Sequence, residues 1–394
     1  MNEADVEYEL LTTAAGVALL DEVAGLRAPR PADLARLRRS ASEASVRAAF
    51  RLVEARRKGA SKFARASAMW LDPVGVEQAT AEHVAAHKAL RFGSGLVFDL
   101  CGGIGGDAVA FARASDVVAV DLDHAMGRRV LWNARVHGVE GRVLAVRSRA
   151  EAVAIPRGAL VHVDPDRRAD PAQRRAQFLD GYQPGLDFLH ALRSKTDGGA
   201  IKLGPASDFD AHFNDAGYEV EVVSLGGECK EATVWFGALA NCRRRASILP
   251  AGATWTDRDA PPAAARVAHT PQTWMFDPDA ALVRAGLLDA FAAAHSLARC
   301  GPGVPYLTGD APLPTPFLSA FRVLDDLPFD FKTLRSYLKG ADLSAREIKP
   351  RGVDVRPEDL RRRLGATGSH AVSLLIYAGV AGARAVVARR ESVS

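Results

Sequence analysis

A glycine-rich turn that follows an apolar run constrains the fold of this 394-residue chain more than any other feature. The run LVFDL (96–100) leads directly into CGGIGGDA (101–108). Glycine permits a tight turn and lets a ligand approach the backbone closely, and a helix that starts after the turn offers free N–H groups to polar ligand atoms. The motif therefore predicts a strand–turn–helix unit that binds a small molecule.

Short apolar runs alternate with helical stretches between residues 95 and 240. This alternation is typical of a parallel sheet covered by helices, so we predict an α/β fold. The carboxyl ends of parallel strands face one crevice, which makes the residues after each strand candidates for ligand binding. The expected strands cover residues 96–100, 117–120, 142–146, 160–163 and 200–203.

Acidic side chains stand at the ends of three of these strands. Asp99 lies near the end of the first strand, and Asp121 follows the second, where a carboxylate can accept hydrogen bonds from ribose hydroxyls. The sequence DPDRR (164–168) follows the fourth. The spacing of Gly103, Gly105 and Ala108 also fits a dinucleotide site, but a carboxylate at Asp99 disfavours a pyrophosphate and favours a cationic ligand.

Basic residues are concentrated in two stretches of the chain. Between Arg27 and Arg65 there are twelve basic and three acidic residues, although the net charge of the whole chain is only +4. The second stretch, from Lys332 to Arg363, has ten basic and five acidic residues. Such stretches indicate electropositive surfaces that could hold a phosphate backbone, and solvated helix faces are the alternative interpretation.

The remaining patterns predict how the chain is divided. Residues 1–85 have apolar residues at helical spacing, and the Pro- and Ala-rich passage 259–265 is expected to be a linker. Beyond it we predict a helix from Ala280 to Ala298 and a β-hairpin formed by 371–377 and 383–388. We therefore expect three domains, which are a basic helical domain (1–85), an α/β domain (86–247) and an α+β domain (270–394).

Several classes of protein are excluded by the sequence. The longest uncharged apolar run, 371–383, is too short to span a membrane, and the acidic N-terminus differs from a signal peptide. The four cysteines lack CxxC spacing, so neither a zinc site nor a disulfide framework is expected. We expect a cytoplasmic protein with no metal and no membrane partner.

The motif at 99–107 resembles motif I of class I S-adenosylmethionine (SAM) methyltransferases, particularly the RNA enzymes related to trimethylguanosine synthase. The stretch VAVDLD (118–123), with NAR (133–135) after it, resembles their next motif. The whole chain resembles bacterial SAM-dependent methyltransferases with a THUMP-like C-terminal domain. The stretches that carry this resemblance are EQAT (77–80), DPDRR (164–168), KLGP (202–205), GECKE (227–231), DPDAA (277–281) and EIKPRGVD (347–354).

This resemblance implies a Rossmann-like class I methyltransferase sheet between the helical domain and a THUMP-like α+β domain, with SAM as cofactor. Asp164 and Pro165 are the expected catalytic residues, and Asp164 would orient or deprotonate the methyl acceptor. The expected cofactor-binding residues are Asp99, Gly103, Gly105, Asp107, Asp121 and Leu122. The expected substrate contacts are Arg167, Arg168, Lys202, Glu228, Lys230 and Glu231.

Two positions depart from the pattern of base-amino methyltransferases. The fourth strand of those enzymes is followed by Asp/Asn-Pro-Pro-aromatic, whereas this chain has DPDR (164–167). Arg149 stands where they often carry an aspartate for the adenine amine. The expected function is methylation of RNA, on a base of tRNA or rRNA. The alternatives are a SAM-binding RNA-interaction protein with little turnover and a methyltransferase for a small-molecule or protein substrate.

Overall fold

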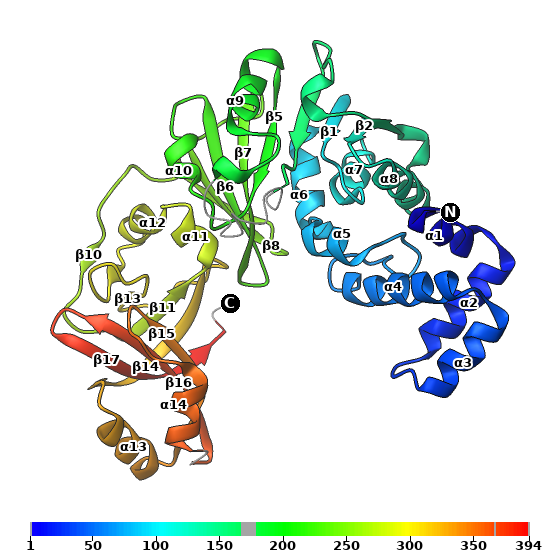
Figure 1. Ribbon diagram of the computed structural model, residues 1–394. Coiled ribbons are helices and arrows are strands. Elements are labelled where there is room, and N and C mark those ends of the chain that lie inside the picture. The colour runs from blue at the N-terminus through cyan, green and yellow to red at the C-terminus, as the bar shows by residue number, and fades with distance from the viewer. Residues whose placement is uncertain (1, 167–178, 366–367, 393–394) are drawn as a thin grey trace. The chain divides into compact units, whose positions relative to one another are not determined.

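The computed structural model describes residues 2–166, 179–365 and 368–392. The chain forms two compact units (Figure 1). The first comprises Met1–Gly217 and Val234–Ala240, and the second comprises Tyr218–Thr233 and Asn241–Ser394. The division into three domains that the sequence suggested stays a prediction.

Helices form the N-terminal part of the first unit. Pro31 begins one of them, where its missing N–H costs nothing, and Ser42 caps another by accepting a hydrogen bond from the Ser45 N–H. Apolar side chains from four of the helices share one core, to which Leu10 and Leu52 belong. None of the helices in the described ranges is long and apolar enough to cross a membrane. The helices are α1 (Glu3–Thr12), α2 (Ala14–Gly25), α3 (Pro31–Ser40), α4 (Glu43–Gly59), α5 (Pro73–Gln78) and α6 (Glu82–Phe92).

The sheet of the first unit has the strand order β3-β2-β1-β4-β5-β7. The pairs β1–β2, β1–β4, β2–β3 and β4–β5 are parallel, as the alternating pattern predicted. A Rossmann-like α/β sheet is thereby confirmed. The strands are β1 (Leu96–Leu100), β2 (Asp116–Asp121), β3 (Val143–Arg147), β4 (Leu160–Val163), β5 (Gly198–Leu203) and β7 (Glu228–Gly237), of which only the last part belongs to this unit.

Strand register brings the ends of three strands together. Leu100 of β1 lies opposite Val120 of β2 on one side and Val163 of β4 on the other. Strands β2 and β3 are added on one side of β1, and β4 and β5 on the other, so the direction in which strands are added reverses between β1 and β4. Open α/β sheets bind their ligands at such a point. Within the described residues this part also contains four α-helices, of which α7 and α8 pack against strands β1 to β3. They are α7 (Gly106–Phe111), α8 (His124–His137), α9 (Leu186–Lys195) and α10 (Phe209–His212).

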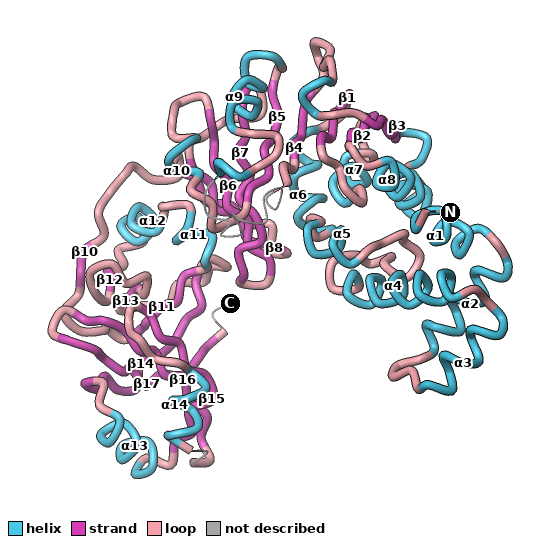
Figure 2. The backbone as a smooth tube through the Cα atoms, viewed as in Figure 1, coloured by secondary structure: helices cyan, strands magenta, loops and turns pink. Residues whose placement is uncertain are grey.

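The second unit contains an eight-stranded sheet of order β10-β12-β13-β11-β14-β17-β16-β15. Helices α13 (Phe331–Gly340) and α14 (Pro357–Leu364) bury leucines in a core with strands of this sheet, which gives the predicted α+β character (Figure 2). The unit also holds β6 (Tyr218–Leu225), β8 (Arg244–Leu249) and β9 (Ala253–Thr256). The sheet strands are β10 (Arg266–Val267), β11 (Trp274–Pro278), β12 (Ala298–Arg299), β13 (Leu307–Gly309), β14 (Leu318–Pro328), β15 (Leu343–Arg351), β16 (His370–Gly379) and β17 (Gly382–Glu391).

Two predictions for this unit have opposite outcomes. The hairpin is confirmed, because β16 and β17 pair antiparallel up to Gly379 opposite Gly382. The prediction of a single helix from Ala280 to Ala298 is wrong, because the structure has two shorter helices in this segment. It is divided into α11 (Ala280–Arg284) and α12 (Leu288–Ala294) because Gly286 between them has a φ of 74°, which is incompatible with a continuous right-handed helix.

Candidate active site

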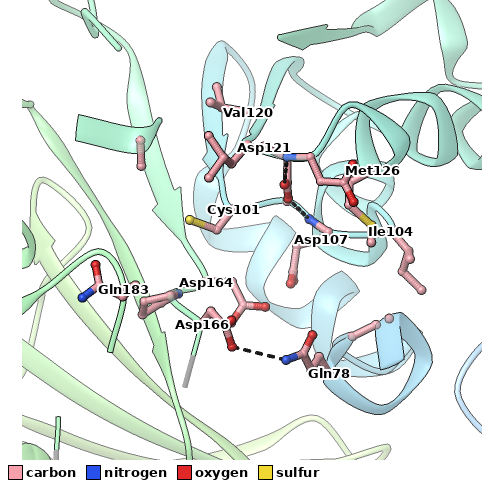
Figure 3. A pocket seen from close by; sticks show the side chains of 18 of the residues that line it. Gln78, Cys101, Ile104, Asp107, Val120, Asp121, Met126, Asp164, Asp166 and Gln183 are labelled. Atoms are coloured by element: carbon pink, nitrogen blue, oxygen red, sulfur yellow. Dashed lines mark hydrogen bonds between the residues drawn. The ribbon is translucent and has the colours of Figure 1, made fainter. Parts of the chain in front are cut away.

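A pocket of about 510 Å³ opens at the carboxyl ends of β1, β2 and β4 (Figure 3). All of its lining residues belong to the first unit. They come from α5, the glycine-rich turn, the end of β2, the start of α8 and the loops after β3 and β4. The pocket therefore lies at the edge of the sheet where the sequence predicted a ligand.

The glycines of the turn have different tasks. Gly103 has a φ of 52°, lines the pocket, and donates its N–H to Asp121 Oδ2 over 3.1 Å. Gly105 has a φ of 86° and does not line the pocket. It lies against α8, where a Cβ on Gly105 would be 3.2 Å from the Cα of Val130. Gly105 thus allows α8 to pack closely behind the turn, and its contact with the cofactor stays a prediction.

Asp121 and Leu122 both line the pocket at the end of β2. Asp121 accepts N–H hydrogen bonds from Gly103 and, over 2.9 Å, from Asp123, as Figure 3 shows. Burial raises the pKa of Asp121 above its ordinary value, and these two N–H groups act in the opposite direction. Leu122 is 63% exposed, so a large apolar side chain is available to a ligand beside an oriented carboxylate.

Asp99 is held behind the pocket rather than in its wall. It is wholly buried, and its Oδ1 lies 2.7 Å from His162 Nδ1. Burial raises its pKa, and the contact with His162 opposes this rise. Its Oδ2 makes no hydrogen bond within the described residues. This oxygen lies close to Gly102, because a Cβ added to Gly102 would be only 3.1 Å from it. Asp99 is not among the residues that line the pocket, and its direct contact with the cofactor stays a prediction.

Asp107 lines the pocket from the first turn of α7. It accepts a hydrogen bond from Thr80 Oγ1 over 2.6 Å and is ion-paired with Lys88 Nζ at 2.9 Å. Burial by itself would raise the pKa of Asp107, but the nearby cations, Lys88 first among them, lower it below its ordinary value. Asp107 is therefore a fixed negative charge in the pocket wall.

Asp164 and Pro165 line the opposite side of the pocket. The Asp164 N–H donates to the Leu100 carbonyl over 3.1 Å, which ties the residue to the end of β1. Its Oδ2 accepts a hydrogen bond from Lys202 Nζ over 2.6 Å, and the same ammonium donates to the Gln78 carbonyl over 3.0 Å. Lys202 does not line the pocket, because its side chain is buried behind Asp164.

The other predicted substrate contacts that lie among the described residues do not line this pocket. Arg167 and Arg168 lie outside the described residues. Glu228 and Lys230 form an ion pair on β7 with 2.7 Å between Oε2 and Nζ. Glu231 is buried and accepts a hydrogen bond from Thr233 Oγ1 over 2.9 Å. The last three belong to the second unit, and their role in substrate binding stays a prediction.

Other lining residues were not expected from the sequence, among them Gln78, Glu151, Asp166 and Gln183. Gln78 Nε2 donates to Asp166 Oδ1 over 3.4 Å, and Asp166 exchanges two backbone hydrogen bonds with Gln183 (Figure 3). Glu151 follows β3, two residues after Arg149, with which it forms an ion pair at 3.6 Å. Gln78 lies in a stretch that carried the family resemblance, but the position of Glu151 depends on the path of the loop and had no signal in the sequence.

The pocket is strongly acidic. Arg149 is the one basic side chain among the described lining residues, against six carboxylates. Such a wall favours a ligand that carries positive charge or several hydrogen-bond donors. In the described part of the chain, no three histidine, cysteine or carboxylate side chains are grouped so as to hold a metal ion. The six carboxylates are those of Asp107, Asp121, Asp123, Glu151, Asp164 and Asp166.

The basic stretch from Arg27 to Arg65 has a partly structural role. Arg56, Arg57, Lys62 and Arg65 donate hydrogen bonds to main-chain carbonyls in other segments of the first unit. Several others form ion pairs, such as the pair between Arg30 and Asp33. Three exposed residues make no hydrogen bond or ion pair to any described residue, which leaves their charge available to a partner. They are Arg27, Arg39 and Arg47.

Comparisons with known proteins agree with this geometry. Residues 94–164 match the family model of RNA cap guanine-N2 methyltransferases, and residues 318–390 match that of THUMP-like domains. The crystal structure of a protein from Porphyromonas gingivalis W83, described there as a methyltransferase, superposes on this chain with a TM-score of 0.74. The superposition covers 100% of both chains, and their sequence identity is 16%. This similarity supports the fold.

Relatives in sequence identify the family. Uncharacterised SAM-dependent methyltransferases of two Mycobacterium tuberculosis strains, CDC 1551 / Oshkosh and ATCC 25618 / H37Rv, are each 37% identical to this chain over 308 residues. The alignment covers 76% of this chain and 82% of each relative. The chain therefore belongs to the family of SAM-dependent methyltransferases, with SAM as its cofactor and a THUMP-like domain in its C-terminal part.

Proposed function

We propose that this enzyme transfers the methyl group of SAM to a base of a structured RNA such as tRNA or rRNA. The observation that carries the proposal is Asp164, which ends the segment that matches RNA cap guanine-N2 methyltransferases and lines an acidic pocket together with Asp166. The match to THUMP-like domains over residues 318–390 supports RNA as the partner.

The pocket residues fit SAM. Bound SAM supplies a methyl group on a positively charged sulfur. Asp107 would face the cationic methionine end, and the buried Asp99 Oδ2, which lacks a hydrogen bond within the described residues, adds negative charge behind the turn. Asp121 would accept hydrogen bonds from the ribose hydroxyls. Leu122 would contact the adenine ring, and Glu151 would accept a hydrogen bond from its amine.

The side of the pocket that would hold the acceptor has carboxylate and amide groups. Asp164 is fixed by Lys202, and Asp166 is in contact with Gln78. Carboxylates accept hydrogen bonds from N–H groups, so they would orient an amino group of a base toward the methyl donor, and Asp164 would receive its proton. None of the described lining residues has an aromatic ring, so the apolar contacts to a base would come from Pro165 and Pro184.

Exposed basic side chains on two helices of the THUMP-like region would bind the phosphate backbone. Leu334 and Leu338 of α13 are buried in the core of the second unit, and so are Leu360 and Leu364 of α14. The opposite faces of these helices carry the charges, and a positive surface of this kind attracts RNA irrespective of its sequence. The exposed basic residues are Lys332, Arg335 and Lys339 on α13, and Arg361, Arg362 and Arg363 on α14.

Transfer of a radioactive methyl group from SAM tests this proposal. The wild-type protein is expected to label total RNA, and Asp164→Asn is expected to reduce the rate at least tenfold. Asp116→Asn, which changes an exposed aspartate at the start of β2, serves as the control and should retain the wild-type rate. Label in protein or small molecules but not in RNA would contradict the proposal. Binding of SAM and RNA without any transfer would favour an RNA-interaction protein instead.

A further inference from the structure

Lys88 is a completely buried lysine that the proposed chemistry does not use. It lies on the apolar face of α6, where Val84, Ala85 and Phe92 are also buried, and its side chain is 0% exposed. Removing an ammonium group from water is unfavourable unless a counter-charge and hydrogen bonds replace its hydration. The partners of Lys88 therefore indicate why the chain has a charge at this position.

These partners connect Lys88 to both carboxylates that flank the glycine turn. Lys88 Nζ lies 2.9 Å from Asp107 Oδ1 and 3.3 Å from His162 Nε2, and His162 Nδ1 lies 2.7 Å from Asp99 Oδ1. An ammonium group can only donate, so His162 Nε2 accepts, and Nδ1 carries the proton that is donated to Asp99. Asp107, whose pKa the nearby ammonium lowers, supplies the counter-charge that the buried lysine requires.

The network fixes one side of the SAM pocket from behind. Asp99 is near the end of β1, and Asp107 is in the first turn of α7, so they lie on either side of the turn that contains Gly103. The rings of Phe92 and Phe111 pack against His162, with centroid distances of 6.3 and 5.2 Å. Little space is left for these polar groups to rearrange, so the direction of each carboxylate depends on its partner.

We propose that Lys88 is a positioning residue for SAM binding, which holds Asp107 in the pocket wall and, through His162, holds Asp99 behind the glycine turn. The negative charge that faces the cationic end of SAM then depends on a lysine that does not touch the cofactor. This inference rests on the proposed placement of SAM against Asp107. It is independent of whether RNA is the methyl acceptor.

Titration calorimetry with SAM alone tests the inference without any measurement of activity. Lys88→Met removes the charge and retains most of the volume, and it is expected to weaken SAM binding at least tenfold. Asp107→Asn should weaken binding as well. Because Lys88 acts through Asp107 and, by way of His162, through Asp99, the double variant Lys88→Met/Asp107→Asn should bind SAM more weakly than Asp107→Asn, but by less than the product of the two single losses. Lys58→Met, which changes an exposed lysine on α4, should bind as the wild type does.

Two results would overturn the inference. One is a folded Lys88→Met protein that binds SAM within twofold of the wild-type affinity. The other is a double variant whose loss of affinity is the product of the two single losses. If Lys88→Met alone does not fold, the double variant, which leaves no unpaired charge in this ion pair, is compared with Asp107→Asn, and equal SAM affinities of these two variants would overturn the inference. Wild-type affinity in Asp107→Asn would instead contradict the proposed placement of SAM.

Discussion

Lys202 Nζ lies 2.6 Å from Asp164 Oδ2 and 3.0 Å from the carbonyl oxygen of Gln78. One buried ammonium thus joins β5, the residue after β4 and the end of α5. These are the segments that border the side of the pocket where we propose that the acceptor binds. The sequence predicted that Lys202 contacts the substrate, but in the structure this lysine fixes the residues that would do so.

Replacement of Lys202 by methionine is expected to slow methyl transfer while SAM binding is retained. Asp164 would lose the partner that fixes its direction, and a misplaced orienting group costs about tenfold or more in rate. SAM affinity should stay within about twofold, because the contacts of Lys202 lie on the acceptor side. Turnover and calorimetry on the same preparation measure both quantities, and Lys195→Met, at the exposed end of α9, is the control. An unchanged rate with weakened SAM binding would contradict this prediction.

The affinity for SAM is expected to fall with decreasing pH because of Asp121. Burial raises the pKa of this carboxyl above the ordinary 3.8, so it takes up a proton at a higher pH than an exposed aspartate does. The neutral form is a weaker acceptor for ribose hydroxyls, and affinity should therefore decrease as the pH is lowered through this raised pKa. Calorimetry in buffers from neutral to acidic pH measures the effect. Asp121→Asn should bind SAM more weakly at neutral pH and lose this part of the pH dependence. A pH profile of SAM affinity identical to that of the wild type would refute the contact of Asp121 with the ribose.

Loss of the Asn133 side chain is expected to destabilise the first unit. This buried amide of α8 accepts from the Trp70 N–H over 2.7 Å and donates to the carbonyls of Trp70 and Ile104 over 3.2 and 2.8 Å. Each buried group left without a partner costs about 1–3 kcal/mol, so Asn133→Ala should lower the free energy of unfolding by about 3 kcal/mol. Urea denaturation measures this loss, and Arg135→Ala on the exposed face should change it by less than about 0.5 kcal/mol. Equal stability of the two variants would contradict the bridging role of Asn133.

Neutralisation of the exposed charges on α13 is expected to weaken RNA binding without a change in SAM binding. The variant replaces Lys332, Arg335 and Lys339 by alanine. Each phosphate contact that is lost reduces the slope of log K against log salt concentration by about 0.7–0.9. If all three residues contact phosphates, the slope of RNA affinity measured over a salt series should therefore be smaller by about 2.1–2.7. Alanine at Arg258, an exposed residue of a loop, is the control, and an unchanged slope in the triple variant would exclude α13 from the RNA surface.

Local patterns predicted the sheet well. β1 and β4 have the same bounds as the apolar runs, because a buried parallel strand consists of consecutive apolar residues between polar ones. The helix expected from Ala280 to Ala298 failed because one glycine with a positive φ, Gly286, interrupts an otherwise helical pattern. A single glycine does not reveal its φ in the sequence.

The residues at strand ends were predictable, but their supporting partners were not. Gly103 and Asp121 follow strands and do line the pocket. Contacts such as that of Lys88 with Asp107, or of Asn133 with Ile104, join segments that are distant in the sequence. For Lys88, the sequence feature that could have indicated a buried partner is its position on the apolar face of the helix 82–92.

Modification of RNA by this SAM-dependent methyltransferase is tested most directly by mass spectrometry of RNA nucleosides. RNA from cells with the protein is compared with RNA from cells that lack it and from cells that carry Asp164→Asn. We expect one methylated nucleoside that is present with the wild type and is absent or strongly reduced in the other two. Identical nucleoside profiles in all three would contradict RNA methylation by this protein.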